Sequence, residues 1–397
     1  MADALFVLNA GSSSLKFSVF VNPHGTVPLL SGSLDCLTGQ PRFMARNVDS
    51  VISQRVWPAD TPLGHDGAIE YLFRWARTGV LGVHRIGAVG HRVVHGGTRF
   101  TAPCVIDADV VKQLEALVPL APLHQPYNVA TIKAVMHIAP GLPQVACFDT
   151  AFHHTQPAVA QTCALPRRFA AEGVRRYGFH GLSYEYIASV LRAREPREGS
   201  GRAIVAHLGN TASLCAMHNG RSIATTMGFT ALDGLVMGTR CGSIDPGVLL
   251  YLIDKYGLTP ANLQTLLYQQ SGLLGLSGIS SKMRSLLASS DPRAAEAVDV
   301  FVYRVQREIG SLAAALGGLD TLVFTGGVGE HAPLVRDRIC RSSAWLGLEV
   351  DDDLNARGAD RISGRDSRVT ALVIHTNEDL MVARHMHRLL ADVARAS

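Results

Sequence analysis

The sequence predicts an α/β protein built from two related halves. Apolar segments typical of buried strands alternate along the chain with segments whose apolar residues recur at helical spacing. In addition, a strand, a turn of small polar residues and a second strand occur at residues 5–20 and again at residues 203–217. A repeat of this kind is typical of duplicated domains. We therefore expect two homologous domains that face a central cleft.

The first half of the chain is expected to be rich in strands. Short apolar runs predict the strands, and apolar residues three and four positions apart predict the helices. Asp66 is a candidate N-cap for the first helix. The charged segment 192–202 contains Pro and Gly and is typical of a solvated loop. The expected strands are 4–9, 15–21, 85–90 and 143–149, and the expected helices are 66–78, 108–118 and 126–138.

The second half continues the alternation of helices and strands. Asp291 and Pro292 are typical of a helix start, and Gly317 and Gly318 are typical of a helix end. A glycine cluster at 326–329 follows a buried strand, which favours close approach of the backbone to a ligand. The expected helices are 246–256, 259–271, 293–316 and 379–394, and the expected strands are 319–325 and 369–375.

The turn at residues 9–16 has the composition of a phosphate-binding hairpin. Gly11 lets the backbone approach an anion, consecutive turn amides can form an anion-binding nest, and Lys16 adds a positive charge. An ordinary serine-rich turn has the same composition, so the turn alone leaves both interpretations open. The sequence contains neither G-x-x-x-x-G-K-[ST] nor G-x-G-x-x-G, so a nucleotide would be bound by a different architecture.

Composition argues against several function classes. Apolar residues make up 47% and charged residues 18% of the 397 residues, as in ordinary globular proteins. The net charge of +4 is spread along the chain, which argues against a nucleic-acid partner, and no apolar stretch is long enough to cross a membrane. The seven cysteines form no C-x-x-C pair, which argues against a zinc site or a disulfide framework. We expect a cytoplasmic protein without membrane or nucleic-acid partners.

Ten segments along nearly the whole chain resemble, in their order, the motifs of the acetate kinase family. These short-chain acyl kinases belong to the acetate and sugar kinase, Hsc70 and actin superfamily. The matching segments are Leu8–Lys16, Gly90–Gly97, Ala121–His124, Cys147–His153, Arg176–Gly181, His207–Asn210, Met227–Thr230, Met237–Pro246, Phe324–Glu330 and Thr376–Glu378.

The resemblance implies a fold, an assembly and a reaction. The fold is a pair of ribonuclease-H-like (actin-like ATPase) domains, and the assembly is a homodimer. The reaction is reversible transfer of a phosphoryl group from ATP to acetate, with Mg²⁺ or Mn²⁺, to give acetyl phosphate and ADP. The resemblance also implies an N-terminal domain at 1–150, completed by a C-terminal helix at about 380–397. A C-terminal domain at 151–379 would hold the nucleotide site and the dimer interface.

The resemblance further implies roles for single residues. Phosphoryl transfer depends on positioning and on stabilisation of negative charge, and Arg92, Arg240 and His180 are the matched cations. Asp149 is the fourth catalytic candidate and would orient the acyl carboxylate or a metal-bound water. It need not be a general base, because acetate is already ionised at neutral pH. A helix cap is the alternative role for Asp149.

Further matched positions fall into three groups, which form the acyl pocket, the metal site and the ATP site. Glu330 and Asp379 are weaker metal candidates than the two residues of the metal group, and the neighbours His153 and His154 are expected to point in different directions. The acyl pocket would contain Arg92, Val94, Leu123, Phe179 and Ala231; the metal ligands would be Asn9 and Glu378; the ATP site would contain Ser12, Ser14, Lys16, His207, Leu208, Gly209, Asn210, Thr211, Lys282, Met283, Arg284, Gly326, Gly327, Val328, Gly329 and Glu330.

The sequence departs from the family pattern at several positions. Ala231 stands where proline is usual and opens the acyl pocket, whereas Val94 favours a small acyl group. Propionate therefore competes with acetate as the substrate, since one methylene changes binding by only ~0.8 kcal/mol. A nucleotide-binding paralogue without turnover is a further alternative, raised by departures in the nucleotide region. These departures are Lys282 for Asp, Thr211 for Gly in a turn expected to need positive φ, and Ala224 for Asp; the other departures from the family pattern are Met283 for Phe, and Leu182 for Thr and Tyr184 for His after His180.

Overall fold

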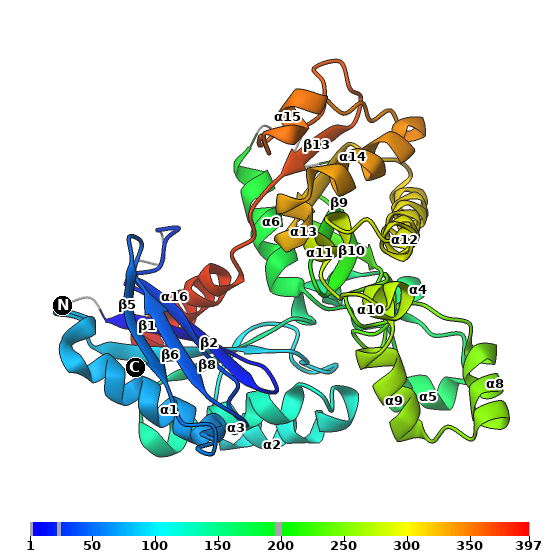
Figure 1. Cartoon of the computed structure of the whole chain (residues 1–397). Coiled ribbons are helices and arrows are strands. Elements are labelled where there is room, and N and C mark those ends of the chain that lie inside the picture. The colour runs from blue at the N-terminus through cyan, green and yellow to red at the C-terminus, as the bar shows by residue number, and fades with distance from the viewer. Residues whose placement is uncertain (1–2, 22–24, 195–200, 397) are drawn as a thin grey trace. The chain divides into compact units, whose positions relative to one another are not determined.

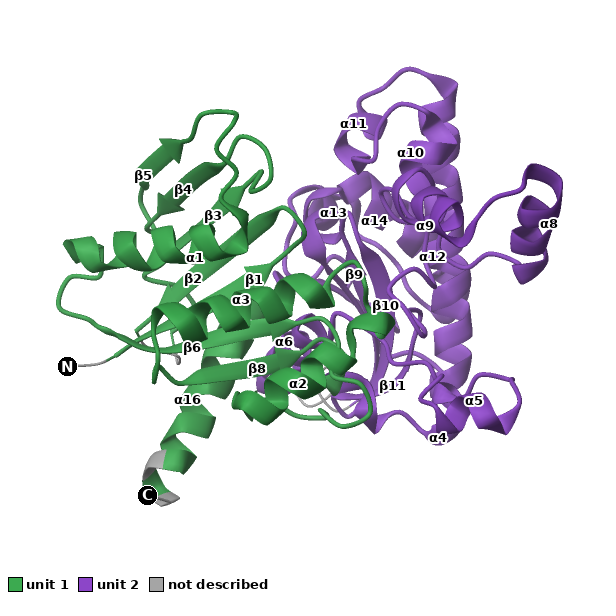
Figure 2. Cartoon of the chain, turned by 90° about the horizontal axis from the view of Figure 1, so that it is seen from below, with its two compact units in different colours: residues 1–151, 377–397 green, residues 152–376 purple. Residues whose placement is uncertain are grey.

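The computed structural model describes residues 3–21, 25–194 and 201–396. The chain forms two compact units of mixed α/β structure (Figures 1 and 2). Unit 1 comprises residues 1–151 and 377–397, and unit 2 comprises residues 152–376. Unit 1 is thus assembled from two stretches that unit 2 separates in the sequence. None of the helices in the described ranges is long and apolar enough to cross a membrane.

Unit 1 is built on a mixed sheet with the strand order β5-β4-β3-β2-β1-β6-β8-β7. The strand β1 pairs antiparallel with β2 on one side and parallel with β6 on the other, and β8 continues the parallel part. The strands are β1 (Ala4–Ala10), β2 (Ser14–Phe20), β3 (Leu30–Asp35), β4 (Arg42–Arg46), β5 (Val51–Val56), β6 (Ile86–Val93), β7 (Cys104–Val105) and β8 (Gln144–Phe148).

Helices cover both faces of this sheet. Phe6 and Leu8 of β1 point into a core that they share with Phe73 and Val135 of two helices on the same face. The C-terminal helix packs on the opposite face so closely that a Cβ at Gly90 of β6 would be 2.4 Å from the Met386 sulfur. A larger residue at position 90 would therefore push this helix away. The helices of unit 1 are α1 (Gly64–Trp75), α2 (Ala108–Ala116), α3 (Gln125–Ile138) and α16 (Glu378–Ala396).

Unit 2 is built on a five-stranded sheet with the order β11-β10-β9-β12-β13. The helix α6 (Gly181–Ala193) packs on one face through Ile187 and Leu191. The long helix α12 (Pro292–Leu316) contacts β9, β10 and β11, and Figure 1 shows α6 and α12 on either side of β9 and β10. The strands are β9 (Arg202–Leu208), β10 (Ala212–His218), β11 (Arg221–Thr225), β12 (Thr321–Thr325) and β13 (Thr370–Val373).

The remaining helices of unit 2 are mostly short. Several of them surround the nucleotide region described below. They are α4 (Ala158–Gln161), α5 (Arg167–Ala171), α8 (Pro246–Tyr256), α9 (Pro260–Gln269), α10 (Gly272–Ser277), α11 (Met283–Leu287), α13 (Gly326–His331), α14 (Pro333–Ser342) and α15 (Asp352–Ala356).

The two sheets share one topology. Each sheet has three antiparallel strands, β3-β2-β1 in unit 1 and β11-β10-β9 in unit 2. Two further strands then run parallel to β1 or β9, namely β6-β8 in unit 1 and β12-β13 in unit 2. This order is the ribonuclease-H-like arrangement. The predicted α/β class and the predicted duplication are therefore confirmed, including the two hairpins that suggested them.

Several predicted boundaries need correction. The helix α1 begins after Leu63, so Asp66 lies in its first turn, where a negative charge still favours the helix dipole, and is not the N-cap. The Asp291 carboxylate does cap α12, because it accepts from the Arg293 N–H at 2.9 Å. The strands β3 to β5 were not predicted. Residues 195–200 of the predicted loop lie outside the described residues.

Three buried histidines make stability depend on pH. Burial lowers the pKa of His91, His95 and His153 to about 4. In the unfolded chain these histidines bind protons with a pKa near 6.5. Their contribution to the free energy of unfolding is therefore fully present above pH 6.5 and is lost as the pH falls towards 4. At pH 5 each histidine should cost about 2 kcal/mol of unfolding free energy relative to pH 7.5.

The variant His91→Gln tests this expectation, because glutamine keeps a donor for the Gln144 side-chain oxygen, 2.7 Å from the His91 ring. Thermal unfolding at pH 7.5 and pH 5 should show a smaller acid loss in His91→Gln than in the wild type. His218→Gln, at an exposed position, is the control and should lose as much as the wild type. Equal acid losses in all three proteins would contradict the expectation.

Candidate active site

In unit 1 the β1–β2 hairpin forms a tight turn at the end of the sheet. The Gly11 N–H donates to the Ser14 carbonyl at 2.8 Å, and the His65 ring lies 2.8 Å from the Gly11 carbonyl. Asn9 and Lys16 lie opposite each other in the strand register. Ser12 is exposed at the tip of the turn. The hairpin therefore presents one amide, one ammonium and a hydroxyl at the same end.

The strands β6 and β8 and the helix α16 bring Arg92, Asp149 and Glu378 together, and we call these residues the arginine–carboxylate cluster. Arg92 lies at the end of β6, and Asp149 directly follows the parallel neighbour β8. The Arg92 guanidinium donates to both Asp149 oxygens, with Nε–Oδ1 and Nη2–Oδ2 distances of 3.0 Å. Its Nη1 donates to Glu378 Oε2 at the start of α16. The three side chains are 15%, 5% and 17% exposed, so the ion pairs are well shielded from water.

The charges in this cluster shift one another's pKa. Burial would lower the pKa of Arg92, but the negative charges of Asp149 and Glu378 outweigh it and raise that pKa. Burial raises the pKa of Glu378, against the influence of Arg92. Arg92 is therefore a permanent cation held in a fixed orientation by its two partners. Asp149 uses both oxygens for this contact.

One buried carboxylate oxygen of the cluster lacks a hydrogen-bond donor or cation. Among the described residues, the buried Oε1 of Glu378 has no hydrogen-bond partner. Its neighbour Asp379 differs, since the Asp379 carboxylate accepts from Ser18 Oγ at 2.6 Å. An unpartnered buried carboxylate oxygen is costly unless a cation or donor completes it. Glu378 thus fits a metal ligand better than Asp379 does.

Val94 directly follows β6, and Val94 and Leu123 are both half-buried. The Val94 N–H donates to Asn128 Oδ1 at 3.1 Å, and Asn128 Nδ2 donates to the Ala10 carbonyl at 3.1 Å. Asn128, on α3, therefore ties the segment after β6 to the segment that ends β1. Sequence reasoning missed Asn128, although a buried asparagine within a helix is unusual enough to have signalled a specific partner.

In unit 2, His180 is held in an uncommon backbone conformation. It precedes α6 with φ +60°, a region that non-glycine residues rarely adopt. Its Nδ1 lies 2.8 Å from Ser213 Oγ, which lies 2.5 Å from the Tyr184 hydroxyl, and its ring stacks on His207 at 4.2 Å. The tyrosine that departs from the family pattern thus belongs to the network that orients His180. Neither Ser213 nor this network was predicted.

The structure also brings Arg240 and Ala231 together. Arg240 Nη1 donates to the Ala231 carbonyl at 3.0 Å, and its guanidinium lies 5.4 Å from the centre of the Tyr268 ring. Burial lowers the pKa of Arg240. Phe179 is buried, and its carbonyl lies 2.9 Å from Nε2 of the buried His153, whereas His154 is exposed. The two adjacent histidines therefore do point apart.

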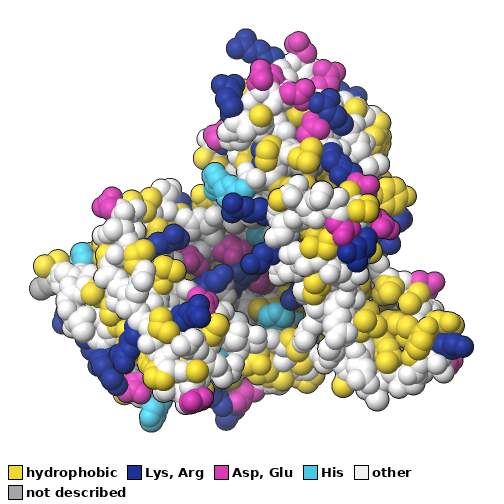
Figure 3. Space-filling model, in the orientation of Figure 1, with side chains coloured by type: hydrophobic (Ala, Val, Ile, Leu, Met, Phe, Trp, Pro, Cys, Tyr) yellow, Lys and Arg dark blue, Asp and Glu magenta, His cyan; other side chains and the backbone are white. Residues whose placement is uncertain are grey.

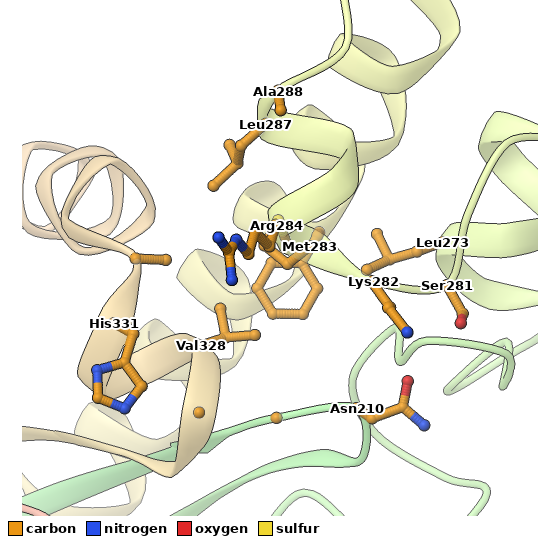
Figure 4. A pocket seen from close by; sticks show the side chains of 14 residues that line it. Asn210, Leu273, Ser281, Lys282, Met283, Arg284, Leu287, Ala288, Val328 and His331 are labelled. Atoms are coloured by element: carbon orange, nitrogen blue, oxygen red, sulfur yellow. The ribbon is translucent and has the colours of Figure 1, made fainter.

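A cavity of about 610 Å³ lies in unit 2 at the end of β9. Figure 4 shows Lys282 and Arg284 at the start of α11 and Asn210 in the turn after β9 pointing into its space. Seven expected ATP-site residues line it, and seven lining residues were not predicted. The first group is Gly209, Asn210, Lys282, Met283, Arg284, Gly327 and Val328, and the second is Leu273, Ser281, Leu287, Ala288, Phe301, His331 and Ala332.

Several other expected ATP-site residues do not line this cavity. The lining does not include His207, Leu208, Thr211, Gly326, Gly329 or Glu330. The Glu330 Oε1 accepts from the Gly326 N–H at 2.9 Å, and its Oε2 lies 2.6 Å from the His375 ring, so the carboxylate holds the glycine turn in place. Gly326 itself has φ +75°, and a Cβ there would be 2.8 Å from the Leu208 carbonyl. The helix α13 begins at this turn.

The expectation of strain at Thr211 is wrong. Thr211 is not among the described non-glycine residues with positive φ, which are Cys36, His180 and Asn219. The tight contact occurs instead at Gly238, where a Cβ would lie 2.0 Å from Asn210 Oδ1. A side chain at position 211 is therefore accommodated without left-handed backbone.

Comparisons with known proteins match this chain over almost its full length. Residues 4–384 match the sequence model of the Acetokinase family. The chain belongs to the acetokinase family. Curated relatives include the acetate kinases of Rhodopseudomonas palustris, 54% identical over 98% of this chain and 99% of the relative, and of Rhizobium meliloti, 49% identical over 98% and 99%.

Solved structures of the acetokinase family agree with the fold. The acetate kinase of Porphyromonas gingivalis is similar with a TM-score of 0.88 and 36% identity, over 98% of this chain and 100% of that chain. A propionate kinase from Francisella tularensis is similar with a TM-score of 0.89 and 37% identity, over 96% and 98%. Fold similarity alone therefore does not separate the two acyl specificities.

Proposed function

We propose that this protein is an acetate kinase, which transfers the γ-phosphoryl group of ATP reversibly and directly to acetate. The observation that carries the proposal is the full-length similarity to curated acetate kinases, at identities up to 54%. An acetate oxygen attacks the γ-phosphorus, a C–O–P linkage forms, and the bond from that phosphorus to ADP breaks. No proton needs to be removed from acetate at neutral pH.

In this proposal each unit has a distinct task. Arg92 of unit 1 pairs with the acceptor and with the negative charge that develops during transfer, and Asp149 positions Arg92 through three hydrogen bonds. Unit 2 binds ATP in the cavity lined by Gly209, Asn210 and Gly327. His180 and Arg240 supply further positive charge.

Asn9 and Glu378 are the proposed ligands of Mg²⁺. Magnesium prefers oxygen ligands, keeps several waters and is held by one or two carboxylates. The unpartnered Oε1 of Glu378 fits this requirement, and the described residues contain no cluster of three His, Cys, Asp or Glu that would suggest another metal site. When bound, Mg²⁺ would neutralise negative charge on the phosphate oxygens.

Trapping of acyl phosphate with hydroxylamine tests the function directly. We expect product from Mg-ATP with acetate, less with propionate and least with butyrate. Absence of product with all three acids, in a protein with the far-UV circular dichroism of a folded α/β chain, would contradict the proposal. A higher kcat/KM for propionate than for acetate would replace it with propionate kinase.

Ala231→Pro should shift selectivity towards acetate. The added ring atoms fill part of the acyl pocket, and no hydrogen bond from the Ala231 N–H to another described residue is lost. The carbonyl that Arg240 contacts is kept. One methylene of space corresponds to ~0.8 kcal/mol, so the acetate-to-propionate ratio of kcat/KM should rise about fourfold. Val94→Ala should move the ratio the other way, and equal effects on both acids would exclude Ala231 from the pocket.

We also propose that the protein is a cytoplasmic homodimer, with α8 in the subunit interface. No residue of α8 is buried, and Leu250, Tyr251 and Tyr256 are 65%, 56% and 62% exposed. Figure 3 shows hydrophobic side chains gathered over the region where Figure 1 places α8 and α9. An exposed apolar patch of this kind is typical of an interface. All seven cysteines are free, which fits a reducing compartment.

Leu250→Asp should convert the dimer to a monomer. A buried, unpaired carboxylate in an apolar interface costs several kcal/mol, which is enough to dissociate most dimers at micromolar concentration. Light scattering after size exclusion should give twice the chain mass of 42.5 kDa for the wild type and a single chain mass for the variant. Val48→Asp, at an exposed apolar position in unit 1, should remain dimeric. A monomeric wild type would contradict the proposal.

A further inference from the structure

A second cavity lies in unit 1, at the end of the sheet opposite to the arginine–carboxylate cluster. Its volume is about 420 Å³, within the range of sites for small organic molecules. It is bounded by the end of α1, by the π-helical turn 76–80, by the start of β6 and by the segment after α3. Because β6 begins at Ile86 and carries Arg92 near its other end, about 20 Å of strand separates the two sites.

The rim of this cavity is basic. Arg77, His84 and Arg85 are lining residues, and no Asp or Glu belongs to the lining. Arg77 and Arg85 are exposed, and neither side chain makes a hydrogen bond or an ion pair with another described residue. The neighbouring Arg74 differs, because it pairs with Glu70 on the same helix and does not line the cavity. Two arginines on one rim therefore lack the carboxylates that usually accompany them.

The floor of the cavity is apolar. Phe73 and Leu81 are 1% and 5% exposed and belong to the hydrophobic core of unit 1, and Ile86 and Leu142 pack against that core. The turn that shapes this floor needs glycine, because Gly79 has φ +89° and Gly82 has φ +61°. The site thus combines an apolar floor with two exposed cationic side chains.

We propose that this cavity is a second ligand site, which binds an organic phosphate monoester with a small apolar body. Guanidinium groups pair with phosphate through two parallel hydrogen bonds, and two arginines match the double negative charge of a phosphate monoester. The apolar body would cover Ile86 and Leu142, two half-buried apolar residues of the lining, which inorganic phosphate cannot do. The site is separate from the one proposed for ATP, and it does not depend on the proposed function.

Phenyl phosphate is the probe, because it joins a phosphate dianion to one ring. Isothermal titration of the full chain should give binding that is at least about tenfold weaker in Arg77→Gln/Arg85→Gln, since each lost hydrogen bond to a charged group costs roughly 1.5–3 kcal/mol. The matched control Arg74→Gln should bind as the wild type does. Any phenyl phosphate bound at the ATP site is retained in both variants, so the difference between them reports on the cavity.

Two further probes separate the parts of the ligand. Inorganic phosphate, which lacks the ring, and benzyl alcohol, which lacks the charge, should each bind the wild type at least about tenfold more weakly than phenyl phosphate. Equal binding of phenyl phosphate to the wild type and the double variant would overturn the proposal, and so would an affinity of the wild type for inorganic phosphate or benzyl alcohol equal to its affinity for phenyl phosphate. The double variant should unfold at the temperature of Arg74→Gln and keep its kcat for acetate, which shows that the fold and the ATP site are intact.

Discussion

Replacing Arg92 by alanine should lower kcat for acetyl phosphate formation by about 10³-fold or more, with a modest change in the KM for ATP. A well-placed arginine contributes about 10³–10⁵ to the rate of phosphoryl transfer. Arg92 is placed by three hydrogen bonds to Asp149 and one to Glu378, within a region that excludes most water. Steady-state kinetics with each substrate varied in turn would separate the loss of kcat from any loss of binding.

Stability must be measured beside activity in this variant. Removal of the Arg92 guanidinium leaves the Asp149 and Glu378 carboxylates buried without their cation. This loss should lower the free energy of unfolding by about 3–5 kcal/mol. Arg92→Lys keeps the charge but not the paired geometry and should recover stability more than kcat. Arg99→Ala, at an exposed position, is the control for loss of an arginine. An unchanged kcat in folded Arg92→Ala would remove Arg92 from the proposed role.

Replacing Glu378 by glutamine should raise the Mg²⁺ concentration needed for half-maximal activity by about tenfold or more, and should lower kcat at saturating ATP. The glutamine oxygen can still accept from Arg92, but the amide group then occupies the position of Oε1, which is the unpartnered atom. An amide nitrogen cannot bind magnesium, whereas a carboxylate oxygen can. Titration of activity with Mg²⁺ at fixed ATP measures the shift.

Asp379→Asn provides the matched control. It is also a buried carboxylate at the start of α16, but its oxygen is already occupied by Ser18. The Mg²⁺ titration of Asp379→Asn should therefore follow the wild type. If both variants needed the same higher Mg²⁺ concentration for half-maximal activity, the negative charge at the start of α16 would be the cause and not ligation by Glu378. If Glu378→Gln needed no more Mg²⁺ than the wild type, Glu378 would be excluded as a ligand.

The fold was predictable where local pattern and turn chemistry agree. Both β hairpins join apolar strands through small polar turns, and α12 carries a proline start and a glycine end, so these elements lie where they were expected. The strands β3 to β5 were missed because none of them contains more than three consecutive apolar residues. All six residues of β5 are exposed or half-exposed, so hydrogen bonding to β4, and not burial, makes this segment a strand.

The site was predictable as a set of residue types but not as a set of partners. Arg92 and Asp149 are 57 residues apart, and Arg92 and Glu378 are 286 apart, so their contact depends on the register of β6 and β8 and on the packing of α16. Similarly, no feature of the local sequence shows that Tyr184 on α6 reaches Ser213 on β10. The local sequence also does not show that the Glu330 carboxylate accepts a hydrogen bond from Gly326.

The division of unit 1 between two separated stretches sets an order for synthesis on the ribosome. Residues 152–376 emerge as one continuous length, so unit 2 can complete its sheet while translation continues. The sheet of unit 1 is synthesised first but lacks α16 until residues 378–396 have left the exit tunnel, and during that interval Arg92 has only one of its two carboxylate partners. Premature termination before residue 377 would therefore leave a polypeptide with a folded nucleotide-binding half and an exposed apolar sheet face. Such a polypeptide would be bound by chaperones or degraded by proteases, and would not act as a less active enzyme.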